Sequence, residues 1–181
     1  TTVFQAISLF DDVSISMGES GSGIKLSITG QTSGGVPVDN SNLAVKAAEL
    51  MVKKYELSND LVIKLKKEIP VAGGMAGGSA DAAGVIVCLD SLFDLGLSRD
   101  VMESIGSQIG ADVPFSISGG VAIGTGRGDQ ITPVLSRGSY SWVLALSSSG
   151  LSTPAVYNEC DRLREGLQVA PPHVSDSLLH A

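Results

Sequence analysis

Cysteine is scarce in this sequence, and long apolar runs are missing. Cys88 and Cys160 have no metal-type spacing and cannot build a disulfide framework, so we expect free thiols in a reducing compartment. The most apolar stretch, GVIVCLDSLF, is interrupted by Asp90 and is too short to span a bilayer. The first residues, TTVFQAISLF, lack the basic segment and apolar core of a signal peptide. We therefore expect a cytoplasmic protein without a membrane partner.

Positive charge is also in short supply. The chain has 12 Lys and Arg against 19 Asp and Glu, a net charge of −7, which argues against nucleic acid as a partner. The same charge repels phosphate at long range, so a phosphate site would have to use backbone N–H groups and helix ends. With 181 residues, 43% of them hydrophobic, the chain can form one domain with a full core and part of a second.

Apolar spacing along the chain predicts a mixture of strands and helices. Strands are expected at 2–9, 12–16, 24–29, 61–67 and 141–147, with the first two paired around Asp11 and Asp12 and the last one buried. Helices are expected at 42–56, 79–95, 99–109 and 153–165. The expected N-terminal caps are Asn40 or Ser41 for the first of these helices, Ser98 for the third and Thr153 for the fourth. A strand, a glycine turn and another strand are expected after GADVPF. This irregular order favours an α+β fold.

The stretch from Pro70 to Ala83, PVAGGMAGGSADAA, places four glycines just before a predicted helix. Glycine costs conformational entropy on folding, and a ligand that must approach the main chain is a common reason to accept that cost. The stretch lacks the G-x-G-x-x-G spacing of a dinucleotide site. Gly73 and Gly78 have the spacing of a Walker loop, but Ser79 stands where its lysine should be.

A third phosphate-binding pattern fits better: a strand, then P-x-x-x-G-x-x-G-[GS]-S, then a helix. Its serine and the first N–H groups of the helix would form an anion cradle at the positive helix end. The residues predicted to bind ATP in this way are Pro70, Val71, Ala72, Gly73, Gly74, Met75, Ala76, Gly77, Gly78 and Ser79. The alternative is a flexible connection with a serine cap and no ligand. Asp81 is expected to point away from the cradle or to lie near a bound cation.

IPVAGGMAGGSADAA resembles the central phosphate-loop motif of the galactokinase–homoserine kinase–mevalonate kinase superfamily. GADVPF at 110–115, TTVFQAISLFDDV near the start and SGLSTPAVY at 149–157 resemble the branch that phosphorylates 4-diphosphocytidyl-2-C-methyl-D-erythritol for isoprenoid synthesis. The resemblance covers nearly the whole chain. The glycine loop identifies only the superfamily, whereas its pairing with GADVPF about thirty residues later is more specific.

The resemblance implies a two-lobed α+β fold. Residues 1–147 would form the N-terminal, ATP-binding lobe without its first strand, and residues 148–181 would begin a ferredoxin-like substrate lobe. The family's early strand with a lysine and an asparagine is not present here, and neither is its late Gly-Ser-Gly-Pro motif. We therefore expect the 181 residues to be the middle of an enzyme and inactive alone.

The implied reaction moves the γ-phosphoryl group of ATP, with Mg²⁺, onto the 2-hydroxyl of the cytidyl substrate. By resemblance, Asp112 is the general base and contacts the substrate, Asn42 and Lys67 border the adenosine, and Phe4 and Tyr157 sandwich the cytosine. ATP and this small molecule are the expected partners. The oligomeric state stays open.

The residues alone also allow other interpretations. Asp112 could be a turn aspartate that bonds the local backbone, and Lys67 could belong, with Lys64 and Lys66, to the solvated face of a strand. GTGRG at 124–128 is more typical of a hairpin turn than of a phosphate site. The chain could be a non-catalytic nucleotide-binding module, or a homoserine or mevalonate kinase, although GADVPF favours the cytidyl branch over both.

Overall fold

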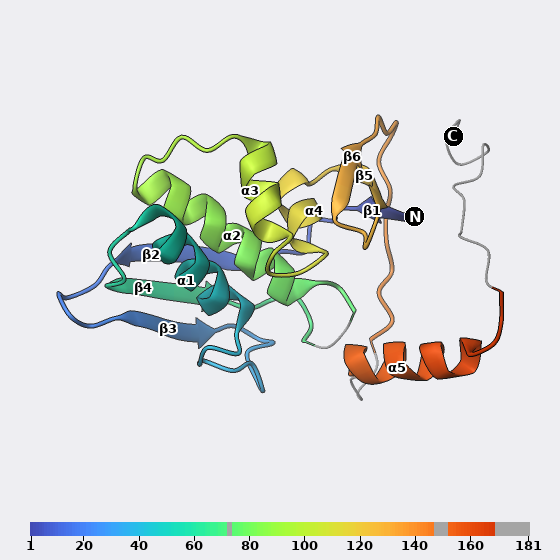
Figure 1. Ribbon diagram of the computed structural model, residues 1–181, viewed down its shortest axis with the longest axis horizontal. Coiled ribbons are helices and arrows are strands. Elements are labelled where there is room, and N and C mark those ends of the chain that lie inside the picture. The colour runs from blue at the N-terminus through green and yellow to red at the C-terminus, as the bar shows by residue number, and fades with distance from the viewer. Residues whose placement is uncertain (72–73, 147–151, 169–181) are drawn as a thin grey trace.

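The strands form two small sheets in a computed structural model that describes residues 1–71, 74–146 and 152–168 (Figure 1). In the first sheet, β4 (Leu61–Lys66) lies between β2 (Asp12–Met17) and β3 (Ile24–Thr29), antiparallel to β2 and parallel to β3. In the second sheet, β5 (Val121–Thr125) lies between β1 (Thr2–Gln5) and β6 (Gln130–Pro133), antiparallel to both. Strands and helices do not alternate regularly, so the predicted α+β class is confirmed.

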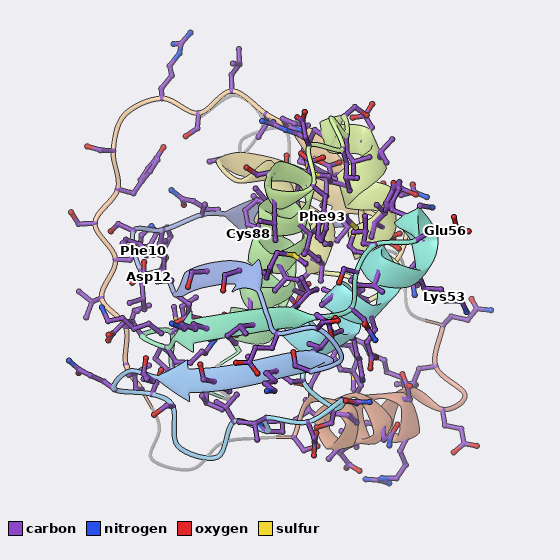
Figure 2. The ribbon with its side chains drawn as sticks, turned by 90° about the vertical axis from the view of Figure 1, so that its left-hand side faces the viewer. Phe10, Asp12, Lys53, Glu56, Cys88 and Phe93 are labelled. Carbon is purple, nitrogen blue, oxygen red and sulfur yellow. The ribbon has the colours of Figure 1, made fainter. Side chains whose placement is uncertain are left out.

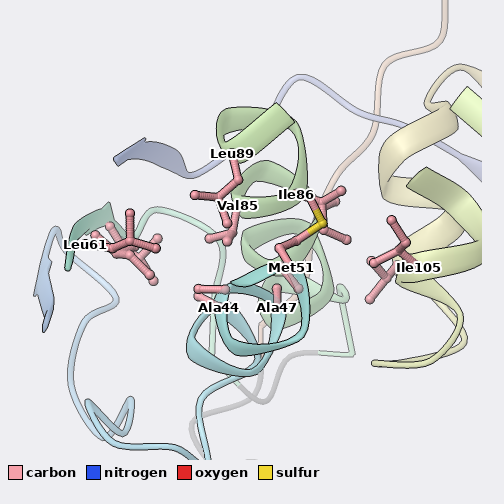
Figure 3. Packing of buried hydrophobic residues seen from close by; sticks show 14 residues of the cluster. Ala44, Ala47, Met51, Leu61, Val85, Ile86, Leu89 and Ile105 are labelled. Atoms are coloured by element: carbon pink, nitrogen blue, oxygen red, sulfur yellow. The ribbon is translucent and has the colours of Figure 1, made fainter. Parts of the chain in front are cut away.

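The core lies between the β2-β4-β3 sheet and two helices, α1 (Leu43–Tyr55) and α2 (Gly77–Leu92) (Figure 3). The alternation in β4 explains this arrangement, because Leu61, Ile63 and Leu65 are buried while Lys64 and Lys66 are exposed. Two shorter helices, α3 (Arg99–Gly106) and α4 (Val113–Ser118), extend the same core with Ile105 and Val113. The last helix, α5 (Thr153–Arg164), buries none of its residues.

Helix α2 approaches the sheet closely because residue 84 is a glycine. A Cβ at Gly84 would lie 2.7 Å from Cγ2 of Val13 on β2, closer than two carbons can pack. One turn later, Cys88 lies on the side of α2 that faces β2, and its thiol donates to the Val13 carbonyl at 3.8 Å (Figure 2). Burial raises the pKa of the Cys88 thiol. Cys88 and Cys160 are both free cysteines, as the sequence predicts.

Several predicted elements are confirmed with small changes of boundary. The strands at 24–29 and 61–66, the hairpin turn at 124–128 between β5 and β6, and the Ser98 cap of α3 all appear. Within the described residues, no helix has the length and apolar character that crossing a membrane requires.

The predicted pairing of segments 2–9 and 12–16 is wrong. β1 pairs with β5, and β2 pairs with β4, so the two segments belong to different sheets. The chain between them leaves the second sheet at Ala6, whose N–H donates to the Gly120 carbonyl. Strand partners are chosen by which apolar faces can be buried together, and that depends on helices far along the chain.

Three helix starts differ from the prediction. α1 is capped by Asn42, whose side chain accepts from the Ala44 N–H, and α5 by Ser152, whose side chain accepts from the Ala155 N–H. α2 starts at Gly77, two residues earlier than predicted, after the left-handed Ala76. A cap needs an oxygen that reaches an N–H two or three residues ahead, and in runs such as DNSN and LSTP neighbouring residues compete for that position.

Two further predictions are wrong. The residues after Asp112 form α4 instead of a strand, because Pro114 is suited to a first helical turn and is buried with Val113. The predicted buried strand at 141–147 is not a strand over 141–146, where Val143 is 97% exposed, while residue 147 lies outside the described residues. An apolar run predicts burial only if another element covers it.

Candidate functional site

A pocket of about 730 Å³ lies where the N-terminal end of α2, the start of α1 and the loop before α4 meet. The predicted site residues that line it are Asn42, Lys67, Pro70, Val71, Gly74, Met75, Ala76, Gly77, Gly78, Ser79, Asp112 and Tyr157. Ala72 and Gly73 lie outside the described residues. The pocket therefore gathers residues from distant parts of the sequence that the resemblance assigns to one site.

Phe4 is the exception among the predicted residues. It does not line this pocket but stacks on Phe115, with ring centroids 4.7 Å apart and an interplanar angle of 18°. The structure therefore does not bring Phe4 and Tyr157 together, and its geometry matches the packing role that is usual for an aromatic residue in a strand. A contact between Phe4 and a substrate stays a prediction.

The glycine loop ends with the first turn of α2 at the pocket. Gly74 and Ala76 have positive φ angles of 70° and 54°, and the chain then enters the helix at Gly77. The first N–H to bond back along the helix is that of Ala80, to the carbonyl of Ala76. The N–H groups of Gly77, Gly78 and Ser79 come before it and have no intrahelical acceptor. Together with the helix dipole, they make this end of α2 suited to an anion.

The first helical residue fits closely against what lies behind it. A Cβ at Gly77 would lie 3.1 Å from Cγ2 of Ile69 and 3.5 Å from Nζ of Lys67. On the other side, a Cβ at Gly110 would lie 3.8 Å from Oγ of Ser79, so the start of α2 meets the loop that carries Asp112. Glycine at position 77 therefore avoids a tight contact with Ile69, and the start of the helix lies next to the Lys67 ammonium.

Asp112 is exposed, lines the pocket and directly precedes α4. Its side chain makes no capping bond to α4, although its backbone carbonyl accepts from Ser116. The carboxylate is thus not engaged as a capping group of α4. Its role as a general base stays a prediction.

Asn42 forms part of the pocket wall and is held from both ends of its amide. Its oxygen accepts from the Ala44 N–H at 2.9 Å, and its nitrogen donates to the Pro37 carbonyl at 2.7 Å. The residue is only 6% exposed. These two hydrogen bonds explain why an asparagine caps the start of α1. A contact between Asn42 and adenosine stays a prediction.

Lys67 does not belong to the solvated face of the strand. β4 ends at Lys66, and the Lys67 side chain turns inward and is 3% exposed. Its ammonium donates to Oδ2 of Asp81 at 2.6 Å and also to Oδ2 of Asp11. Oδ1 of Asp11 accepts from the N–H groups of Glu68 and Ile69 at 2.6 and 2.9 Å. We call Asp11, Lys67 and Asp81 the buried charge cluster.

The two carboxyl groups of this cluster have opposite pKa shifts. Burial raises the pKa of Asp81 to about 6; Lys67 opposes this rise, and repulsion by Asp11 adds to it. Burial also acts on Asp11, but the bonds from Lys67 and from the N–H groups of Ile69 and Glu68 outweigh it and lower its pKa. Oδ1 of Asp81 is buried and has no hydrogen-bond partner among the described residues.

Sequence reasoning missed the buried charge cluster. The sequence predicts Asp11 between two paired strands, and Asp81 away from the cradle or near a bound cation. One available signal was a carboxylate in an otherwise apolar helix, since Asp81 is followed by AAGVIV. A charge in that position is seldom buried unless it is paired.

Residues 42–120 match the family model described as the GHMP kinases N terminal domain, which contains the glycine loop, α2 and Asp112. Residues 42–120 therefore carry the GHMP kinases N terminal domain. These kinases are the superfamily that the loop motif resembles.

Curated relatives that are similar over nearly the whole chain share a more specific name. The chain is 47% identical over 182 residues to a protein of Rhodococcus jostii and 48% identical over 176 residues to one of Nocardia farcinica. Both are named 4-diphosphocytidyl-2-C-methyl-D-erythritol kinase. The matches cover 99% and 97% of this chain but 57% and 56% of the relatives, so the chain spans little more than half their length.

Solved structures agree on the GHMP kinase fold. A crystal structure of 4-(cytidine 5'-diphospho)-2C-methyl-D-erythritol kinase matches with a TM-score of 0.59 and 27% identity, over 86% of this chain and 53% of that one. Mevalonate kinase of L. major, solved with R-mevalonate, matches with a TM-score of 0.65 over 91% of this chain and 55% of that one. At 14% identity, the second match shows the fold alone.

Proposed function

We propose that the full-length protein transfers the γ-phosphoryl group of ATP to the 2-hydroxyl of 4-diphosphocytidyl-2-C-methyl-D-erythritol, a step of non-mevalonate isoprenoid synthesis. One observation carries the proposal: the start of α2 and Asp112 line the same pocket. The names of relatives that are 47–48% identical support this choice of substrate.

The glycine loop would hold the triphosphate. The N–H groups of Gly77, Gly78 and Ser79 and the positive end of α2 would supply the anion site, and Lys67 lines the same pocket. Among the described residues, no group of three or more His, Cys, Asp or Glu side chains could hold a metal ion. Mg²⁺ would enter as part of the substrate Mg-ATP, bound chiefly by its phosphate oxygens.

Asp112 would accept the proton of the attacking hydroxyl. Phosphoryl transfer depends mainly on positioning and charge neutralisation, and a carboxylate at the pocket can orient the hydroxyl and remove its proton. Asn42 would form the adenosine side of the pocket, and Tyr157 would stack on the cytosine. Lys67 would act from behind the loop, because its ammonium is already bonded to two carboxylates.

We also infer a division into an N-terminal ATP-binding lobe, residues 1–147, and the start of a substrate lobe, residues 148–181. The proposed boundary falls among residues 147–151, which the structure does not describe. The partners would be ATP and the cytidyl substrate, with neither nucleic acid nor a membrane, and the location would be the cytoplasm.

The test uses the full-length protein with Mg-ATP and three acceptors in parallel: the cytidyl substrate, homoserine and mevalonate. Formation of the phosphorylated acceptor, followed by ³¹P NMR, should occur with the cytidyl substrate alone. Phosphorylation of homoserine or mevalonate instead would replace the proposal with a sibling kinase. Nucleotide binding without any transfer would reduce the protein to a nucleotide-binding module.

A further inference from the structure

Two carboxylates of the buried charge cluster share one ammonium. The side chains of Asp11, Lys67 and Asp81 are 1%, 3% and 2% exposed, so water screens none of them well. When both carboxyl groups are ionised, the buried charge cluster carries one net negative charge. Burying an unbalanced charge is costly, and a carboxyl group can avoid that cost by taking up a proton.

The Asp81 side chain has room for that proton. Its Oδ2 is bonded to Lys67, whereas its Oδ1 has no partner among the described residues. Asp11 differs, because both of its oxygens accept hydrogen bonds. Of the two carboxyl groups, Asp81 is therefore the one that titrates near neutral pH, and its pKa is raised to about 6.

The buried charge cluster lies directly behind the proposed phosphate site. Nζ of Lys67 is 3.5 Å from the position of a Cβ at Gly77, the first residue of α2, and Asp81 follows one turn later. Lys67 and Asp81 both line the pocket. A negative ligand at this helix end would therefore act on Asp81 across a short, poorly screened distance.

Few other charges act on Asp81. Lys67 after β4 and Asp11 before β2 are the charged groups that shift it, and Lys67 is its only ion-pair partner within the described part of the chain. The remaining charged residues on α1, α3 and β2 and directly before α4, the elements that surround α2, are Lys46, Glu49, Lys53, Lys54, Arg99, Asp100, Glu103, Asp112 and Asp12.

We propose that Asp81 takes up a proton when a nucleotide polyphosphate binds at the start of α2, so that nucleotide affinity rises as the pH falls. The proposal rests on the proposed nucleotide site. The bound polyphosphate disfavours the ionised form of Asp81 and so raises its affinity for a proton. Because binding linkage is reciprocal, protonation of Asp81 raises the affinity for the nucleotide by the same factor.

The direction of the pH dependence follows from this linkage. Below about pH 6, Asp81 is already protonated in the free protein, and it adds no pH dependence to nucleotide affinity. Above that pH, the affinity falls by up to about tenfold per pH unit, until the pH exceeds the pKa of Asp81 in the complex. The effect is thus confined to the range between the two pKa values.

Calorimetry on the full-length protein tests the proposal with ADP, which permits no turnover. Titrations at pH 7 in two buffers of different ionisation enthalpy give the number of protons taken up per ADP bound. The wild-type protein should take up more protons than Asp81→Asn. ADP's own protonation cancels in this comparison. Between pH 6 and pH 8, the wild-type affinity should fall about fivefold or more beyond the fall seen for Asp81→Asn.

Glu103→Gln is the matched control, because burial also raises the pKa of Glu103 but this residue does not line the pocket. It should behave like the wild type. If Asp81→Asn does not fold, Asp11→Asn serves instead: it removes the repulsion on Asp81 and leaves Lys67 to pair with it, so the proton uptake should shrink.

Each remaining result contradicts a particular claim. Equal proton uptake by the wild type and the folded Asp81 or Asp11 variant would overturn the linkage while leaving the nucleotide site intact. Reduced uptake in Glu103→Gln would also overturn the assignment to Asp81. A wild-type protein that binds neither ADP nor ATP would contradict the proposed function itself.

Discussion

Two ion pairs in this protein have the same N–O distance but different surroundings. Lys67–Asp81 and Glu159–Arg162 are both separated by 2.6 Å. The side chains of the first pair are 2–3% exposed, whereas those of the second are 54–65% exposed. Water and salt weaken an exposed pair, whereas removal of one member of a buried pair leaves a charge without compensation. The N–O distance alone therefore does not show which of the two ion pairs matters more for stability.

Asp81 of the first pair lies on α2 and both members of the second pair lie on α5, and these two helices line the same pocket. α2 packs on α1 and the β2-β4-β3 sheet, while α5 buries none of its residues. The glycine loop thus ends on a helix fixed by the core, and Tyr157 is presented by a helix that is exposed along its length. We expect substitutions behind α2 to change stability and those on α5 to change binding alone.

The largest effect is expected for Asp112→Asn, which keeps the shape of the side chain and removes the proposed base. Turnover of the full-length enzyme should fall about 10²–10⁴-fold, the usual contribution of a general base. Single-turnover kinetics with separate binding measurements should place the loss in the chemical step. Asp100→Asn, in the exposed first turn of α3, is the control. A loss of less than about threefold in the chemical step is too small for a general base and would show that Asp112 is not one.

Lys67→Met should be the most destabilising change among the charged residues. It leaves Asp11 and Asp81 buried together without a cation, and removal of one partner of a buried pair costs about 3–5 kcal/mol. Urea denaturation measures the loss. Lys64→Met, on the exposed face of β4, should have little effect, and adding Asp81→Asn to Lys67→Met should recover part of the stability. Equal midpoints for the two lysine variants would contradict the structural role of the buried charge cluster.

Asp81→Asn should change how stability depends on pH. The pKa of Asp81 is about 6 in the folded protein, above its ordinary value of 3.8, so the native state holds this proton more tightly than the unfolded state. The associated stability is present below about pH 4 and is lost as the pH rises to about 6. At 1.36 kcal/mol per pKa unit, this loss is at most about 3 kcal/mol. The variant should lack it, and parallel pH profiles for the two proteins would refute the assignment.

Tyr157→Ala should weaken binding of the cytidyl substrate by about 1–3 kcal/mol, the usual contribution of a base stacked on an aromatic ring. ATP affinity and the denaturation midpoint should stay close to the wild-type values, because Tyr157 is 67% exposed. Tyr140→Ala, an exposed tyrosine that does not line this pocket, is the control. Phe4→Ala should instead lower stability, since Phe4 stacks on Phe115. Equal loss of both ligands in Tyr157→Ala would point to misfolding.

The smallest effect is expected for Glu159→Gln. The variant breaks the exposed Glu159–Arg162 pair on α5, and its denaturation midpoint should not differ from that of the wild type. A shift comparable to that of Lys67→Met would show that α5 is held far more firmly than its exposure indicates.

Local patterns predicted much of the fold because the physics behind them is local. Alternation of apolar and polar residues, complete in β3 and partial in β4, predicted these strands, and a serine before the first helical turn predicted the start of α3. The sequence predicts a hairpin between the first two strands because they are neighbours in the chain. Their true partners lie much farther away, about 120 residues from β1 and about 50 residues from β2. The sequence predicts a strand at 141–147 because it does not show what covers an apolar run, and no strand forms over 141–146.

The sequence alone determined that a glycine-rich loop leads into a helix and that an aspartate lies in the GADVPF motif. Both features are short contiguous motifs, and their local conformation depends mainly on their own residues. Only the tertiary structure decided that Asp112 lies at the same pocket as the start of α2, and that Lys67 is buried between Asp11 and Asp81. Along the chain, Asp11 lies 56 positions before Lys67, and Asp81 lies 14 positions after it. A strand end, a segment between two sheets and a helix must all be packed before one ammonium can meet two carboxylates.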